Sequence, residues 1–252
     1  MNVVGAFYPL FMAMAQRTDG GEVARLRAQL DRAQGRRVRT PPLPTHPLIA
    51  ALLPEGGLRP GETYAVSDSA SLLLALLAPV SRAGSWCAAV GMPTLGTEAA
   101  ESAGIALERL VLVPDPGPRW LAVTAAIAEV MPIVALRPPG RVADADVARL
   151  SARLRDRGAV LLVQGAWPQA QAMLSLHDPA WTGVGNGHGC LTQREATVTV
   201  SSRRFPVPRS TRLLLPDPAG VLAAPRQDSP AERQERPAPW QDSPAPRLRA
   251  VG

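Results

Sequence analysis

The chain has 252 residues, 46% of them hydrophobic, and 27 basic against 21 acidic residues, which gives a formal charge of +6. Every basic residue is arginine, and the absence of lysine excludes Schiff-base catalysis, a lysine general base and a lysine on nucleotide phosphates. The two cysteines are too few for a disulfide framework, and with the three histidines they form no metal-binding set. No apolar run reaches the roughly 20 residues of a membrane span. We therefore expect a cytoplasmic protein without a metal, a cofactor or a membrane contact.

Residues 1–40 form an N-terminal segment with seven arginines and three acids. Residues 2–15 are apolar and end like a signal-peptidase site, but no basic residue precedes the apolar part. Whether residues 1–15 belong to the natural protein stays open. Residues 21–36 predict an amphipathic helix rich in arginine, and the prolines of residues 41–44 end it and form a linker.

Residues 41–224 predict one globular domain in which short apolar strands alternate with helices. This alternation is typical of an α/β fold with a mostly parallel sheet that helices cover on both faces. The expected strands are 63–67, 85–91, 110–113, 133–136 and 159–163, and the expected helices are 46–53, 71–80, 97–103, 119–130 and 143–157.

After residue 171 the pattern changes to one of strands alone, which predicts an antiparallel C-terminal extension over residues 173–177, 195–201 and 210–215. The glycines of residues 183–189 lie between two strands rather than between a strand and a helix. We therefore expect a hairpin tip there and not a nucleotide-binding loop. Residues 225–252 are rich in Pro, Gln, Ser and charge, with Trp240 standing alone, and predict a disordered tail. The tail repeats Gln-Asp-Ser-Pro-Ala at 227–231 and 241–245, either as low-complexity sequence or as a partner-binding motif.

The order of these segments resembles the RecA recombinase core over roughly residues 47–216. Residues 56–66 carry a glycine turn that leads into a strand, and residues 103–113 carry an alanine-glycine step before the next strand. Residues 159–164 resemble the family's strand that ends in glutamine, and residues 195–215 resemble its closing strands. The resemblance implies a RecA-like core.

The segment that matches the family's phosphate-binding loop lacks the chemistry of such a loop. It reads Ser67-Asp68-Ser69-Ala70-Ser71, without a glycine to wrap phosphates, without lysine, and with the negative charge of Asp68 in their place. No arginine lies between Arg59 and Arg82 to compensate, and no magnesium-binding acid follows residues 133–136. These departures predict a degenerate domain that is not an enzyme and binds no nucleotide cofactor.

The two loops that hold DNA in the recombinase are short in this chain. They correspond to residues 137–143 and to residues 165–172, which include Trp167. Gln164 matches the position that couples nucleotide to DNA in the recombinase, and without a nucleotide we expect a structural role for it.

RecA-like cores without ATPase motifs in arginine-rich chains of this size resemble the ImuA-type accessory proteins of the damage-inducible mutagenesis cassette. The actinobacterial variety is the most similar, through residues 85–87 and 137–141. This resemblance implies a scaffold in SOS-induced translesion synthesis. Its implied partners are a catalytically silent Y-family polymerase homologue, an error-prone replicative-type polymerase and RecA. Two alternatives stay open: a cell-division inhibitor of the SulA type, and a residual DNA-binding ATPase of the RecA family.

The candidate surface residues are mostly arginines, which suit phosphate through bidentate hydrogen bonds but are also this chain's only solubilising cations. We expect weak DNA binding, or merely a solvated face, at two groups, and either solvent or a partner protein at a stripe on the helix 143–157. Trp240 is a further candidate for partner binding. The first group is Arg25, Arg32, Arg36, Arg37 and Arg39, the second is Arg203 and Arg204 with Arg209 and Arg212, and the stripe is Arg149, Arg153 and Arg157.

Overall fold

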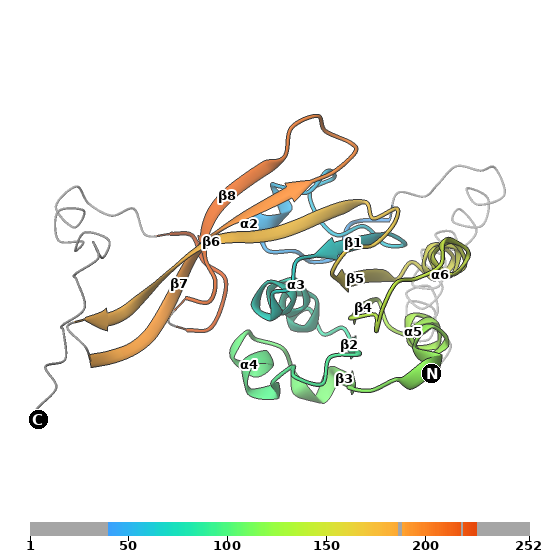
Figure 1. The fold of residues 1–252 in the computed structure, drawn as a ribbon, viewed down its shortest axis with the longest axis horizontal. Coiled ribbons are helices and arrows are strands. Elements are labelled where there is room, and N and C mark those ends of the chain that lie inside the picture. Colours follow the sequence, from blue (N-terminus) through green and yellow to red (C-terminus); the bar gives the residue numbers. More distant parts are fainter. Residues whose placement is uncertain (1–39, 186–187, 218, 226–252) are drawn as a thin grey trace, which may run out of the picture.

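The structure, a computed structural model, describes residues 40–185, 188–217 and 219–225. The expected helix at residues 21–36, the N-terminal arginine group, the repeat and Trp240 lie outside these residues. Within them an eight-stranded sheet has the order β3-β2-β4-β5-β1-β6-β7-β8 (Figure 1). In the described part of the chain, no helix has the length and apolar character needed to cross a membrane.

The first five strands are parallel, as the sequence predicts, and each predicted strand and helix boundary lies within three residues of the observed one. The strands are β1 (Thr63–Val66), β2 (Cys87–Val90), β3 (Leu110–Val113), β4 (Ile133–Leu136) and β5 (Val160–Gln164). The helices are α2 (Pro47–Ala50), α3 (Ala70–Arg82), α4 (Thr97–Ser102), α5 (Trp120–Ala128) and α6 (Asp144–Arg157), with the 3-10 turns η1 (Leu107–Arg109) and η2 (Gly117–Arg119).

Helices cover both faces of the parallel strands. Helices α3 and α4 lie on one face, and α5 and α6 on the other (Figure 1). Alternate residues of each strand point to opposite faces, so Cys87 and Ala89 join the core under α3 while Ala88 and Val90 join the core under α5 and α6. Burial on both faces explains why these strands are apolar without alternation.

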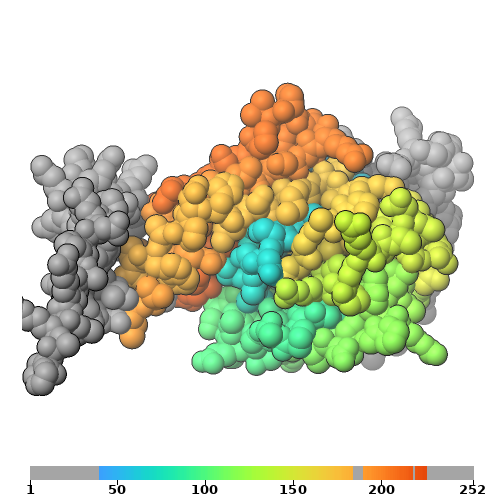
Figure 2. All heavy atoms as spheres, viewed as in Figure 1, coloured from blue at the N-terminus to red at the C-terminus, as the bar shows by residue number. Residues whose placement is uncertain are grey.

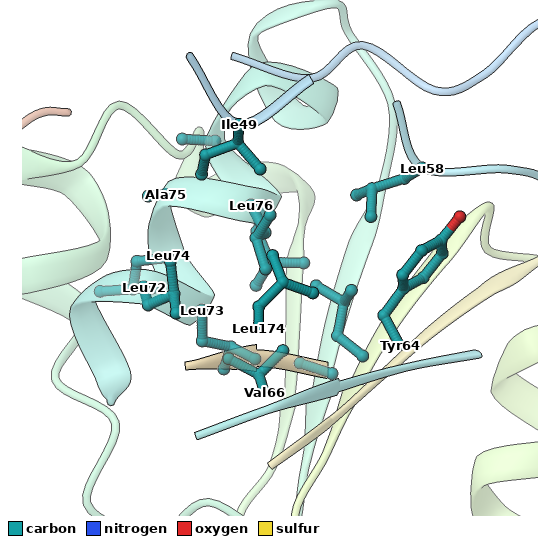
Figure 3. Packing of buried hydrophobic residues seen from close by; sticks show 14 of the residues in the cluster. Ile49, Leu58, Tyr64, Val66, Leu72, Leu73, Leu74, Ala75, Leu76 and Leu174 are labelled. Atoms are coloured by element: carbon teal, nitrogen blue, oxygen red, sulfur yellow. The ribbon is translucent and has the colours of Figure 1, made fainter. Parts of the chain in front are cut away.

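Helix α3 is the most deeply buried helix of the described structure. Its residues 72–78 are all buried, because strands lie on one side of it and the segment around α2 on another. Figure 3 shows Leu76 packed among Ile49, Val66 and Leu174. A helix that is apolar all round is stable only when neighbours surround it. Helix α3 is accordingly the centre of the core on its face of the sheet.

The antiparallel extension is confirmed, but two of its strands are longer than predicted. They are β6 (Ala172–Gly185) and β7 (His188–Ser201), followed by β8 (Arg209–Leu214). The sequence predicts only residues 173–177 and 195–201, because the outer residues contain proline and glycines that disfavour strands. The outer pairing is irregular, with register shifts on both sides of residues 180–182. Gly185 pairs with His188, so the glycine run does lie at the hairpin tip.

The outer half of this hairpin is a two-stranded ribbon. Strand β1 pairs with β6 only over residues 172–174, and β8 pairs with β7 only over residues 195–200. We call residues 178–185 and 188–193 the hairpin arm, and Figures 1 and 2 show it extending away from the helices. Its apolar side chains Trp181 and Leu191 are 47% and 56% exposed.

Candidate functional site

The loop between β1 and α3 lies outside the carboxyl ends of the parallel strands, where open α/β sheets bind ligands. It contains only Ser67, Asp68 and Ser69. Ser69 caps α3, since its hydroxyl accepts the Leu72 N–H at 3.3 Å and lies 3.2 Å from the hydroxyl of Ser71. None of the three has a positive φ. The loop therefore builds a helix cap rather than a cradle of backbone N–H groups for phosphates.

Asp68 is held by side chains that arrive from two other strands. Its carboxylate accepts a hydrogen bond of 2.8 Å from Gln164 Nε2, at the end of β5. Its second oxygen lies 3.4 Å from Arg137 Nη2, just after β4. Because parallel strands end at one edge of the sheet, three residues far apart in sequence meet there. This hydrogen bond gives Gln164 a contact consistent with the structural role expected for it.

The expectation that no arginine compensates Asp68 is wrong. That expectation considered only the sequence between Arg59 and Arg82, whereas tertiary structure brings Arg137 from the end of β4 and Arg194 from β7. Arg137 is paired with the Asp68 carboxylate, whereas Arg194 binds the neutral Ser71 hydroxyl. Two arginines thus lie beside the loop, and one of them already forms an ion pair.

Arg194 is a site residue that the sequence interpretation did not identify. Its Nη2 donates to Ser71 Oγ, its Nε donates to the Leu215 carbonyl at 2.7 Å, and its guanidinium lies 5.3 Å from the centre of the Trp181 ring. Burial lowers the pKa of Arg194. Residues 193–196 give no sign of this role, because the partners lie on α3, β6 and the segment after β8.

These residues line one end of a cavity of about 720 Å³ beside α3. Its walls are α3, α4, the base of the hairpin arm and residues 215–216 and 220–222. A smaller cavity of about 250 Å³ also borders Asp68 and is lined by Met92 and Leu95. No group of three or more His, Cys, Asp or Glu in the described residues could hold a metal ion.

The predicted arginine groups are separate in space. Arg203 and Arg204 lie in the turn between β7 and β8, at the top of Figure 1, and the stripe lies on α6, at the right. Arg204 pairs with Glu55, Arg212 with Glu195 at 2.5 Å, and Arg209 lies over the Phe205 ring. On α6, Arg149 pairs with Asp146 at 2.6 Å and Arg153 approaches Glu129 at 3.9 Å, while Arg157 is exposed. DNA contact therefore stays a prediction.

Comparison with known proteins finds two similarities, and the first of them lies over the parallel strands. Residues 51–169 match the family model of the MT3502 N-terminal domain. The chain is 38% identical over 128 residues to the uncharacterized protein Rv3395c of Mycobacterium tuberculosis (strain ATCC 25618 / H37Rv). That alignment covers 49% of this chain and 63% of the mycobacterial protein, so the chain matches less than two thirds of its relative. The family match begins just after α2 and ends in the loop after β5, before the hairpin arm.

Proposed function

We propose that the protein is a non-catalytic scaffold with a degenerate RecA-like core, acting in SOS-induced translesion mutagenesis. It works through protein contacts, with DNA contact as a secondary role. Its proposed partners are the catalytically silent Y-family polymerase homologue, the error-prone replicative-type polymerase and RecA. Three features support the RecA-like assignment: β1 lies centrally between β5 and β6, the loop after β1 leads into a buried helix, and the last strands are antiparallel.

The observation that carries the non-catalytic part is the state of the loop after β1. Catalytic phosphate loops present backbone N–H groups, a lysine and a magnesium-binding hydroxyl to the nucleotide. In this chain the corresponding loop carries Asp68, which is bound by Gln164 and Arg137. The Ser69 and Ser71 hydroxyls bind each other. A triphosphate would have to displace these pairs, and displacing Arg137 would leave the Asp68 carboxylate unpaired beside a like charge.

The similarity to a mycobacterial protein supports the actinobacterial setting of the proposal. The family-model match at residues 51–169 covers the parallel strands and their helices, the part that a RecA-like scaffold would keep as its frame. The name of that relative states no activity. The proposed partners therefore rest on the resemblance of this chain to ImuA-type proteins in the order and spacing of its segments.

Two measurements on the full-length protein test the function. Isothermal titration with ATP and magnesium should show no binding tighter than about 1 mM. A micromolar dissociation constant would instead favour the alternative of a residual DNA-binding ATPase. A pull-down with the silent Y-family polymerase homologue should retain the protein at physiological salt. An empty pull-down would contradict the proposed role in translesion synthesis. Filamentous growth on overexpression would favour the alternative of a SulA-type division inhibitor.

A further inference from the structure

The cavity of about 720 Å³ is a groove that follows one face of α3. Ser71, Ala75 and Arg82 line it and lie on the same side of the helix, because 11 residues make about three turns. From Ser71 to Arg82 the helix rises about 16 Å. Figure 2 shows the cyan surface around the start of α3 directly beside the orange surface of the C-terminal strands, which form one wall. The floor is apolar and made mostly of small or aliphatic side chains, namely Leu74, Ala75, Ala99, Ala103, Leu176 and Leu222.

One end of the groove holds a guanidinium that has no anionic partner among the described residues. Arg194 is half-buried, and its partners in the described structure are neutral groups: the Ser71 hydroxyl, the Leu215 carbonyl and the face of Trp181. No carboxylate of the described residues lies within ion-pair distance of it, whereas Arg149, Arg204 and Arg212 each have one. Buried charges in proteins are normally paired, because desolvation disfavours the isolated ion. The lowered pKa of Arg194 reflects that desolvation.

The other end of the groove is also cationic. Arg82 closes α3 there and forms no ion pair within the described part of the chain. Beside it lies His46, whose pKa is lowered by burial first and by Arg82 second, a shift that favours the uncharged imidazole. Asp68 is the acid at the rim, and its carboxylate is bound to Gln164 and Arg137. The groove thus has an apolar floor between two cations.

This arrangement matches the chemistry of a peptide. A span of about 16 Å holds roughly five residues of extended chain or three turns of helix. Grooves with apolar floors bind amphipathic segments through apolar anchors, and charges at the ends fix the direction. We propose that the groove beside α3 binds an acidic and apolar peptide segment of a partner protein. The segment's carboxylates pair with Arg194 and Arg82, and its apolar side chains rest against Ala75, Ala99 and Leu176.

The proposal rests on the scaffold function proposed above and names the surface through which the scaffold acts. It also explains why the loop after β1 is short and capped. Since Asp68 and the serines are satisfied by the protein, the groove is left to apolar and carboxylate contacts rather than to phosphates. The region that a nucleotide would occupy in an active core then becomes a docking site.

The test does not require the partner to be identified first. A random dodecapeptide library displayed on phage is selected against the full-length protein, and an enriched peptide is synthesised with a fluorescent label. We expect enriched sequences to combine Asp or Glu with Leu, Ile or Phe. Fluorescence polarisation should show at least about tenfold weaker binding to Arg194→Gln, because the variant loses the charge-assisted hydrogen bonds to the peptide's carboxylate.

Two further variants separate the groove from the rest of the surface. Ala99→Phe fills the groove from an exposed position on α4 and should weaken binding by at least about tenfold without unfolding the protein. Arg153→Gln removes an exposed arginine on α6 and should change binding less than about twofold. The thermal unfolding midpoint of each variant is first compared with that of the wild type. If Arg194→Gln does not fold, the binding of Ala99→Phe tests the proposal in its place. Enriched peptides without acids, or equal binding to all variants, would overturn the proposal.

A photo-crosslinking amino acid at position 99 identifies the occupant. Crosslinks to the added peptide support the proposal. Crosslinks to residues 226–252 of the same chain would assign the groove to the protein's own C-terminal segment, and crosslinks between two copies would assign it to self-association; either result would overturn it. The peptide test contains no polymerase of the mutagenesis cassette, so it is independent of the pull-down. Peptide binding with an empty polymerase pull-down would support the docking groove and contradict the translesion function. A failed peptide test with a positive pull-down would contradict the docking groove and leave the translesion function supported.

Discussion

The parallel half of the molecule and its hairpin arm are held together by different forces. In the parallel half, β1, β2 and β4 are buried along their entire length and helices cover both faces. In the arm, the described residues 178–185 and 188–193 have a neighbouring strand on one side only, and Trp181 and Leu191 are about half exposed. Apolar burial stabilises the first region, while ladder hydrogen bonds maintain the second. Damage to the parallel half should therefore unfold the protein, whereas damage to the arm should change only its local shape and contacts.

The largest effect should come from truncating a leucine in the core. Leu76→Ala removes a side chain that is fully buried in the same core cluster as Ile49 of α2, and should lower the free energy of unfolding by about 2–5 kcal/mol. The matched variant Leu191→Ala removes an exposed leucine from the arm and should change it by less than about 0.5 kcal/mol. Urea unfolding followed by circular dichroism measures both. Similar losses in the two variants would show that the arm belongs to the cooperative core.

The next effect compares two glycines whose surroundings leave no room for a side chain. Gly91 has φ +74°, and a Cβ there would lie 2.3 Å from the carbonyl oxygen of Arg137. Gly183 has φ +114°, and a Cβ would lie 2.2 Å from the carbonyl oxygen of Cys190. Gly91→Ala should cost about 1–3 kcal/mol of global stability, because it displaces the loops that follow β2 and β4.

Gly183→Ala should instead leave the urea midpoint nearly unchanged and speed backbone amide exchange in the arm alone, since the strain can relax there. Hydrogen exchange with mass spectrometry on both variants separates these outcomes. A large drop in global stability for Gly183→Ala would contradict the proposed independence of the arm.

The smallest effect concerns pH and the two cysteines. Burial raises the pKa of the Cys87 thiol from 9.0 to about 12, while Cys190 is exposed on β7. Below pH 9 the Cys87 thiol is protonated whether the chain is folded or not, so it costs no stability. As the pH rises from 9 towards 12, the unfolded thiol ionises first and stability falls, by about 1.4 kcal/mol between pH 8 and pH 10.

Urea unfolding at these two pH values should therefore show a loss about 1.4 kcal/mol smaller for Cys87→Ala than for wild type. Cys190→Ala should lose as much as wild type. In the native protein, a thiol reagent should modify Cys190 at once and reach Cys87 only on unfolding. Rapid modification of both thiols at pH 8 would show that the core around β2 opens more easily than its burial implies.

The candidate site lies where these two regions meet. Ser71 belongs to the core helix α3, whereas Arg194 and Trp181 come from the base of the arm, and the three are joined in one contact network. One wall of the groove belongs to the buried core and the other to the less buried arm. The arm can therefore adjust its position when a partner segment binds. Arg137 and Gln164, by contrast, both come from the rigid half and fix Asp68 there.

Local sequence patterns are sufficient to specify the parallel half: its apolar strands, the amphipathic α6 and the Ser69 cap follow from neighbouring residues, and the predicted boundaries agree within three residues. The same patterns show that the loop after β1 lacks the residues for phosphate binding. The length of the hairpin arm, the pairing of Asp68 with Gln164 and Arg137, and the place of Arg194 emerge only when the chain is folded. The cause is the range of the interactions. Burial patterns and caps act over a few neighbouring residues, whereas the contacts Asp68–Arg137, Asp68–Gln164 and Arg194–Ser71 join residues between 69 and 123 positions apart.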